Sequence, residues 1–302
     1  MKKLLILAFL LLVAATPAAA AVKVVTSLQD FASIADSIGG NRVETFAIAK
    51  GYQDPHFVDP KPSFVLKLNR ADLLIVAGLD LEIGYIRPLI DQSRNEKIHP
   101  GNRGYLDASA GCDILDRATG VVTRAGGDVH PFGNPHYWLD PNNGRVIARS
   151  IAAKLSELDP AGRTTYQQNL AAFESKLTAK DREWLSKMAP YYGTKVVTFH
   201  KAWPNFAKHF KLDVVGQIEP KPGIPPSPSH TLEIINLIRT EKVPVILVEP
   251  YFDTKTPNFI ASKTGAQVVK FYPSVGGIPQ IKDYFALFDY DIDALVNALK
   301  SK

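Results

Sequence analysis

The chain has 302 residues, of which 46% are hydrophobic and 22% are charged, a balance typical of a folded globular protein. Its 22 prolines and 20 glycines are dispersed along the sequence, which excludes a collagen-like or low-complexity chain. The formal charge of +5 is small and spread out, so no nucleic-acid partner is expected.

The N-terminus has the pattern of a secretory signal peptide. Two lysines precede an apolar run over 4–14, and small residues at 18–20 follow it. The run is shorter than the roughly 20 residues that cross a bilayer, so we expect residues 1–20 to be removed and the mature chain to lack a membrane span. The only cysteine, Cys112, lies far from the expected cleavage site. We therefore expect a periplasmic protein without a lipid anchor.

After residue 20, short β-branched segments alternate with amphipathic ones, which is typical of parallel sheets covered by helices. In the first half, the sequence predicts strands at 22–27, 43–48 and 72–78 and helices at 28–38, 63–69 and 144–158. In the second half, it predicts strands at 195–199, 212–218, 243–248 and 267–271 and helices at 231–240, 257–264 and 283–299. We expect two α/β lobes, over 21–158 and 191–302.

The segment between the lobes, 159–190, is predicted to form one long helix. Asp159 and Pro160 are typical of a helix start. An apolar stripe at helical spacing follows, formed by Tyr166, Leu170, Phe173, Leu177, Trp184 and Met188. About 30 residues at 1.5 Å each give a rod of about 45 Å, which would reach both lobes and restrict hinge motion. Two helices broken near 178–181 are the alternative.

Three of the seven histidines lie where open α/β sheets bind ligands, near the carboxyl ends of strands. His56 lies in the sequence DPHFVDP, His136 lies in NPHYWLDP, and His200 ends the strand predicted at 195–199. Imidazoles from two lobes that meet in a cleft would suit an ion such as Zn²⁺, which takes neutral nitrogen ligands. Because these residues are far apart in the sequence, three unrelated loop histidines are the alternative.

Glu249 is a fourth candidate ligand because it ends the very apolar run over 243–248. A carboxylate at the tip of a buried strand needs a partner, which would be a metal ion or a lysine such as Lys201. Asp140 follows His136 and either orients a ligand histidine or forms an ordinary turn. The histidines at 99, 209 and 230 are expected to be exposed or helix-associated and to carry no function.

Ordered motifs along the whole mature chain resemble those of the ABC-transporter solute-binding proteins that capture zinc or manganese in the periplasm. The segment 134–141, NPHYWLDP, resembles the second ligand motif of that family and is the most specific match. Segments 54–63 and 197–206 resemble the first and third ligand motifs, and 226–229, 248–252 and 264–266 resemble later landmarks. The resemblance implies two α/β lobes joined by one long helix, with the metal in the cleft.

The chain departs from the family pattern in two places. Family members usually supply a fourth, aspartate ligand after the final strand, whereas this chain reads Tyr272-Pro273-Ser274. We expect Glu249 to replace that aspartate, with water or Tyr272 as alternatives. The stretch 111–133 also lacks the His-rich tract of several zinc-specific relatives, and a lone His130 does not form one.

The resemblance implies a periplasmic metal receptor that is not an enzyme. Nothing in the sequence argues for an oligomer, so we expect a monomer. It would hold Zn²⁺, or alternatively Mn²⁺ or Fe²⁺, at His56, His136, His200 and Glu249 and deliver the ion to a membrane permease. A secreted zinc hydrolase is the main rival, but the sequence contains neither H-E-x-x-H nor G-x-S-x-G. A surface adhesin on the same fold would require an anchor site.

Overall fold

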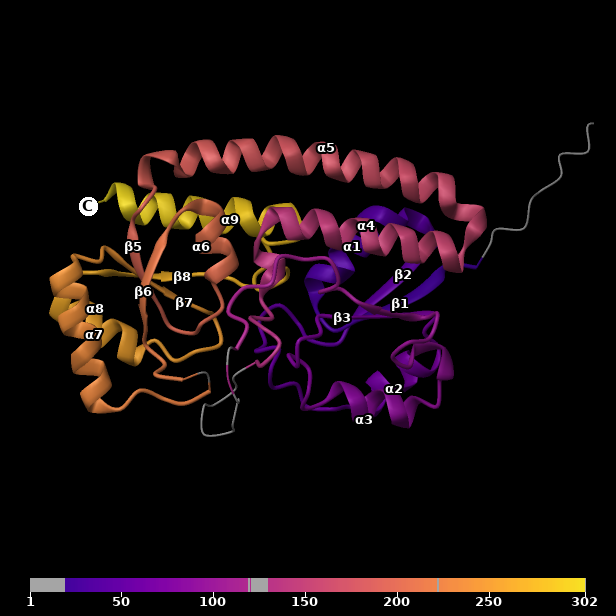
Figure 1. The fold of residues 1–302 in the computed structure, drawn as a ribbon, viewed down its shortest axis with the longest axis horizontal. Coiled ribbons are helices and arrows are strands. Elements are labelled where there is room, and N and C mark those ends of the chain that lie inside the picture. The colour runs from indigo at the N-terminus through magenta and orange to yellow at the C-terminus, as the bar shows by residue number, and fades with distance from the viewer. Residues whose placement is uncertain (1–19, 119, 121–129, 222, 302) are drawn as a thin grey trace, which may run out of the picture.

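A computed structural model describes residues 20–118, 120, 130–221 and 223–301 (Figure 1). The signal peptide expected over 1–20 lies, except for Ala20, outside the described residues. Two lobes lie side by side, and one long helix runs across the top of both in Figure 1. The prediction of two α/β lobes with mainly parallel sheets flanked by helices is confirmed.

The first lobe contains a parallel sheet of order β2-β1-β3-β4. Its strands are β1 (Val22–Thr26), β2 (Val43–Ala47), β3 (Leu73–Val76) and β4 (Tyr105–Asp107). All four residues of β3 are buried, because helices cover both faces of a parallel sheet. The helices α2 (Pro62–Asn69) and α3 (Ile86–Ser93) pack together on one side, and α1 (Gln29–Gly39) and α4 (Pro141–Leu158) pack together on the other (Figure 1).

The second lobe repeats this plan with a parallel sheet of order β6-β5-β7-β8. Its strands are β5 (Lys195–Thr198), β6 (Asp213–Gln217), β7 (Val245–Val248) and β8 (Gln267–Lys270). Its helices are α6 (Pro204–Phe210), α7 (Pro228–Glu241), α8 (Lys255–Thr264) and α9 (Tyr284–Lys300). Single 3₁₀ turns complete the described elements, at η1 (Gly40–Arg42), η2 (Glu96–Ile98), η4 (Tyr137–Leu139), η5 (Pro160–Gly162) and η6 (Ala189–Tyr191).

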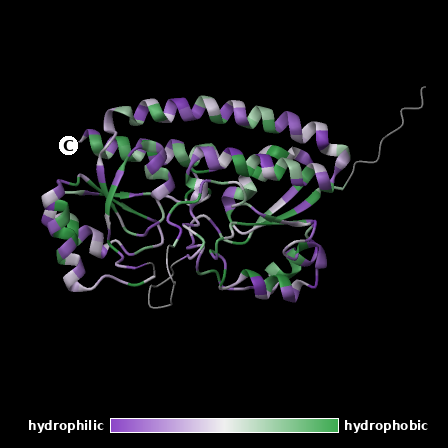
Figure 2. Cartoon of the chain, in the orientation of Figure 1, coloured by the Kyte–Doolittle hydropathy of each residue, from purple (hydrophilic) through white to green (hydrophobic). Residues whose placement is uncertain are grey.

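The connection between the lobes is the continuous helix α5 (Arg163–Met188), with η5 before it and η6 after it. The two-helix alternative is therefore wrong, since α5 runs unbroken through 178–181. The predicted stripe faces the interior: five of its members are buried, and Leu170 is partly buried. The helix α5 contacts α1 and α4 of the first lobe and α9 of the second. Figure 2 shows polar and apolar residues alternating along α5, whereas the strands of both sheets are largely apolar.

One apolar core extends through both lobes. The largest cluster of buried side chains includes β1 and β3 of the first lobe and α6 and α9 of the second. Trp184 of α5 packs against Phe288 of α9 with ring centroids 4.9 Å apart. Near the cleft, Tyr284 donates a hydrogen bond to the Trp138 carbonyl oxygen at 2.5 Å, which ties α9 to the first lobe. No helix in the described part of the chain is both long and apolar enough to span a bilayer.

Candidate metal centre

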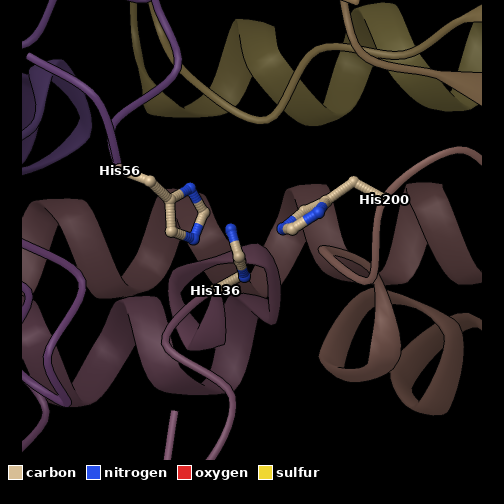
Figure 3. A group of neighbouring side chains, drawn as sticks. All are labelled: His56, His136 and His200. Atoms are coloured by element: carbon tan, nitrogen blue, oxygen red, sulfur yellow. The ribbon is translucent and has the colours of Figure 1, made fainter. Parts of the chain in front are cut away.

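The three predicted histidines converge between the lobes. His56 lies in the loop between β2 and α2, His136 lies just before η4, and His200 follows β5. Figure 3 shows the three imidazoles pointing toward one another, two from the first lobe and one from the second. One ring nitrogen of each lies within 4.8 Å of those of the other two. The structure therefore brings the three candidate ligands together in one place.

The spacing of the three rings fits a tetrahedral ion. The ring centroids are 5.2 Å apart for His56 and His136, 5.2 Å for His56 and His200, and 5.3 Å for His136 and His200. A zinc–nitrogen bond of about 2.0–2.1 Å places each centroid about 3.2 Å from the ion, so tetrahedral angles separate two centroids by about 5.2 Å. The three rings are therefore spaced as three ligands of one tetrahedral ion would be.

Each of the three imidazoles has its Nδ1 fixed by an oxygen acceptor. Because amide and carboxylate oxygens only accept, Nδ1 carries the proton in the neutral form of each ring, and Nε2 then keeps its lone pair. The pairs are His56 with Asp54 at 2.7 Å, His136 with Asn134 at 3.0 Å, and His200 with Glu219 at 2.7 Å. The Nε2 atoms of the first two histidines are buried without a protein partner, as metal-ready ligands would be.

The two first-lobe histidines are positioned by the same local turn. The Asp54 side chain accepts from the His56 backbone N–H at 3.0 Å, and the Asn134 side chain accepts from the His136 backbone N–H at 3.0 Å. Such Asx turns are favoured by Asp and Asn, and the intervening proline fixes one backbone angle of each turn. The motifs D-P-H and N-P-H thus orient an imidazole without help from a helix or strand.

Burial and neighbouring charges shift the pKa values of His136, His200 and Asp54 in different directions. Burial, reinforced by the nearby histidines, holds the pKa of His136 well below 6.5. Burial alone would lower the pKa of His200, but the hydrogen bond to Glu219 and the charges of Glu249 and Glu219 raise it. The pKa of Asp54 is lowered, because its hydrogen bonds and charge interaction with His56 outweigh its burial. Asp54 therefore stays ionised and adds negative charge beside the site.

Glu249 lies outside the group formed by the three histidines. It is fully buried, and its Oε1 accepts from Trp203 Nε1 at 2.8 Å, whereas its Oε2 has no protein partner. Burial raises its pKa to about 7. The alternative partner Lys201 is wrong, because that lysine pairs with Asp116 at 3.0 Å.

The loop that usually carries the aspartate ligand has a packing role in this chain. Ser274 Oγ and the Val275 backbone N–H donate to the two carboxylate oxygens of buried Asp30, the second at 3.1 Å. The Pro273 carbonyl oxygen accepts from Trp138 Nε1 at 2.8 Å. The Tyr272 ring packs edge-on against Tyr290, with centroids 5.4 Å apart. The loop therefore fastens the second lobe to the first.

The structure decides between two pairs of alternatives for residues near the site. His209 was expected to be exposed or helix-associated, and it lies in α6 with only 7% of its side chain accessible; its two ring nitrogens pair with Asp140 at 3.2 Å and Asp181 at 2.6 Å. Asp140 orients no ligand histidine; it caps α4 by accepting from the Asn142 backbone N–H at 2.8 Å. Its turn-forming role was the other alternative.

The structure also brings a fourth histidine to the cluster. The His130 ring centroid lies 5.3 Å from that of His56, and its Nδ1 lies 3.1 Å from the Leu79 carbonyl oxygen. Burial and the nearby His56 lower its pKa to about 4. In the sequence analysis His130 was considered only as a possible part of a His-rich tract, which the stretch 111–133 lacks. No motif or spacing in the sequence links His130 to His56. His130 is held near His56 by its contact with Leu79, which lies in the turn after β3.

A cavity of about 470 Å³ lies beside the histidines. His56 and His200 contribute to its wall, together with the aromatic side chains of Phe57, Phe199 and Phe252. The candidate centre therefore has an approach for its ligand.

Comparison with known proteins gives a consistent set of relatives. The family model for periplasmic zinc-uptake complex component A matches residues 24–298. A metal ABC transporter substrate-binding lipoprotein of Streptococcus cristatus is 28% identical, with 91% of this chain and 88% of that protein covered. A manganese ABC transporter substrate-binding lipoprotein of Streptococcus gordonii is 27% identical, with 91% and 88% covered.

Comparison with solved structures leads to the same family. A crystal structure of ZnuA superimposes with a TM-score of 0.76 and 26% identity, with 92% of this chain and 99% of that chain covered. A zinc-bound deletion mutant of ZnuA gives 0.75, with the same identity and 92% and 98% covered. The similarity therefore includes both lobes and the connecting helix.

Proposed function

The chain belongs to the family of periplasmic zinc-uptake components, the substrate-binding proteins of metal ABC transporters, and on that premise we propose that it captures Zn²⁺ between its lobes. The family consists of solute-binding proteins and not of enzymes, so the hydrolase alternative is excluded. The ion is the cargo, and a membrane permease receives it.

The observation that carries this proposal is the convergence of three imidazole nitrogens from the two lobes. His56, His136 and His200 are proposed to bind the ion through Nε2, because their Nδ1 atoms are all engaged. Glu249 was the candidate fourth ligand from the sequence. Only its Oε2 is free for that role.

The choice of zinc rests on the chemistry of the donors. Imidazole nitrogen suits zinc, whereas manganese prefers carboxylate, carbonyl and water oxygen. One relative is named for manganese, and one structural neighbour is zinc-bound. Mn²⁺ is therefore an alternative cargo, and Fe²⁺ remains the other alternative from the sequence analysis. A centre with three nitrogen donors favours zinc among them.

We propose a periplasmic location for the mature chain, from the signal-like pattern over 1–20 and the family description. The streptococcal relatives are named lipoproteins, which makes a membrane-anchored form the alternative. Osmotic shock of cells distinguishes the two: release of the protein supports a soluble form, and retention with the membrane pellet overturns it.

The decisive experiment is metal analysis of the mature protein beside the His136→Ala variant, after both are stripped with a chelator. We expect one tightly bound zinc per chain in the wild type and loss of tight binding in the variant. His99→Ala is the matched control, since it removes an imidazole outside the cluster. A wild-type protein that binds no transition metal at micromolar concentrations would overturn the proposal, and a preference for manganese in competition would overturn the choice of zinc.

A further inference from the structure

A fourth imidazole stands at the edge of the candidate centre. The His130 ring lies 5.3 Å from the His56 ring, and the two planes are tilted by 37°. Rings within the three-histidine group are 5.2 to 5.3 Å apart. His130 therefore stands at the distance from His56 that two ligands of one tetrahedral ion would have.

The hydrogen bonding of His130 also matches that of the other three residues. Its Nδ1 faces the Leu79 carbonyl oxygen at 3.1 Å, and a carbonyl only accepts, so Nδ1 carries the proton. Its Nε2 is buried and has no hydrogen-bond partner among the residues that the structure describes. An unpartnered buried polar atom destabilises the fold, and a bound ion would remove that penalty.

We propose that His130 Nε2 supplies the fourth ligand of the metal, in place of the aspartate that the final loop lacks. This inference rests on the proposed function of the three-histidine centre. The His130 nitrogen lies outside the group whose atoms are all within 4.8 Å of one another, so the ring must move toward the ion. The movement is local, because a turn closed by the Gly133 N–H and the His130 carbonyl oxygen at 3.2 Å separates His130 from the second ligand motif.

The turn over 130–133 is fixed at its C-terminal end and exposed to solvent at its tip. The Asn134 backbone N–H donates to the Leu115 carbonyl oxygen at 2.8 Å, which fixes the end next to the ligand motif. Phe132, at the tip, is 56% exposed and does not hold the turn in the core. Gly133 has a φ of 116°, a conformation that other residues rarely adopt, and it lies so close to Ile114 and Leu115 that a Cβ would not fit. The end of the turn next to His136 is therefore fixed, and the movement that we require is a rotation of the His130 side chain.

His130 fits the fourth position better than Glu249 does. Both residues lie outside the three-histidine group, so either one must move to reach the ion. Glu249 is fully buried, and its carboxylate is held by Trp203 Nε1, whereas His130 lies two residues from the exposed Phe132 at the tip of its turn. The Leu79 contact of His130 uses Nδ1, so ligation through Nε2 engages the opposite side of the ring. A centre of four neutral imidazoles would select zinc over cations that prefer oxygen. Its positive charge would be balanced by the carboxylates of Asp54 and Glu219 behind two of the rings.

The test counts metal-bound imidazoles directly. The protein is labelled with ¹⁵N-histidine, and the Nε2 resonances are followed by NMR during titration of the stripped protein with zinc. Of the seven histidines, four are expected to show the Nε2 shift of metal ligation, and His130→Ala is expected to leave three. Three shifted resonances in the wild type, none of them from His130, would overturn this inference and leave the proposed function standing. Absence of any shifted resonance would overturn both.

Affinity measurements supply a second readout. His130→Ala is expected to weaken zinc binding at least about 10- to 100-fold, the range seen when even an outer-shell partner of a metal ligand is removed. His99→Ala is the matched control and should bind zinc as the wild type does. Glu249→Gln should retain four shifted imidazoles. Unchanged zinc affinity in His130→Ala, with lost affinity in Glu249→Gln, would assign the fourth position to Glu249.

Discussion

Each candidate ligand histidine depends on a single oxygen acceptor that holds its ring. Asn134 illustrates this at the residue level, because its Oδ1 accepts from both the backbone N–H and the Nδ1 of His136, each at 3.0 Å. Its Nδ2 donates to the Lys201 carbonyl oxygen at 2.7 Å, next to His200 in the second lobe. One side chain therefore sets the tautomer of one ligand and ties it to the loop of another.

We expect Asn134→Ala to weaken zinc binding by about 10- to 100-fold, because the His136 ring loses its orientation and its fixed tautomer. Competition with a chromophoric zinc chelator measures the change. Asn102→Ala is the control, since the exposed Asn102 side chain donates only to the Glu96 carbonyl oxygen. Wild-type affinity in Asn134→Ala would show that packing alone orients the imidazole.

His209 provides a pH-dependent contribution to stability. Burial alone would lower its pKa, but its hydrogen bonds and charge interactions with Asp140 and Asp181 raise the pKa to about 9. A histidine whose pKa is raised from 6.5 in the folded state stabilises fully below pH 6.5 and loses this contribution as the pH rises to about 9. The contribution is about 1–3 kcal/mol for this shift in a mostly buried side chain.

Urea denaturation of the wild type and of His209→Gln, at pH 6.5 and pH 9, measures this contribution. The free energy of unfolding should favour the wild type at pH 6.5, and the two proteins should converge at pH 9. The difference between them removes the effect of other titrating groups, such as the buried carboxyls of Asp30 and Glu82, whose pKa values burial raises to about 7. A difference that does not change with pH would contradict the ion-pair account.

The sequence predicted which residues could meet at the centre, but not all of them. D-P-H and N-P-H turns orient an imidazole through local hydrogen bonds, so His56 and His136 were identifiable from short motifs. His130 was not, because its position depends on a contact with the Leu79 carbonyl oxygen, 51 residues away in the chain. Glu249 was placed correctly at the end of a buried strand, but sequence could not show that Trp203 engages it.

At the scale of elements, periodic segments were predictable and short ones were not. The strands of both sheets and the long helix α5 follow from β-branched runs and an apolar stripe. The helix α6 has 7 residues and the strand β4 has 3, too few for a periodic pattern to emerge. The helix α3 was also not predicted, although α2 has the same length of 8 residues and was predicted. Tertiary contacts stabilise such elements: Phe206 and Phe210 of α6 are buried against the core.

Gly144 in α4 leaves room for the side chain of Tyr284, the first residue of α9. A Cβ at Gly144 in α4 would lie 2.7 Å from Tyr284 Cζ, closer than packed atoms approach. Tyr284 cannot retreat freely, because its hydroxyl donates to the Trp138 carbonyl oxygen at 2.5 Å. The absence of a side chain at Gly144 thus lets the Tyr284 ring lie directly against α4.

We expect Gly144→Ala to lower the free energy of unfolding by about 1–3 kcal/mol, as overpacked cores do. This loss should appear although alanine is favoured over glycine inside helices by about 1 kcal/mol. Chemical denaturation measures it, with Gln168→Ala on the exposed side of α5 as the control. Equal or higher stability in Gly144→Ala would mean that α4 and α9 separate easily.

At the scale of the whole molecule, the two lobes are held together by a long helix and by a shared apolar core. The helix α5 packs on both of them, and one buried cluster extends through both. The loop after β8 reaches the first lobe, where Asp30 accepts from Ser274 and Val275 and where Trp138 donates to Pro273. A wide opening of the cleft would break all of these buried hydrogen bonds at once. It would also expose the apolar surface that is buried between the two lobes.

Metal binding should therefore change the overall shape very little. Small-angle scattering profiles of the stripped and zinc-loaded protein are expected to superimpose, because loop movements near His56 and His130 leave the lobes in place. Asp30→Ala is the informative variant: it removes the acceptor for Ser274 and Val275, so its metal-free form should scatter as a more open particle than the wild type. Compaction of the wild type on zinc binding would show that the lobes rotate about α5, and cargo release would then require domain opening instead of local rearrangement.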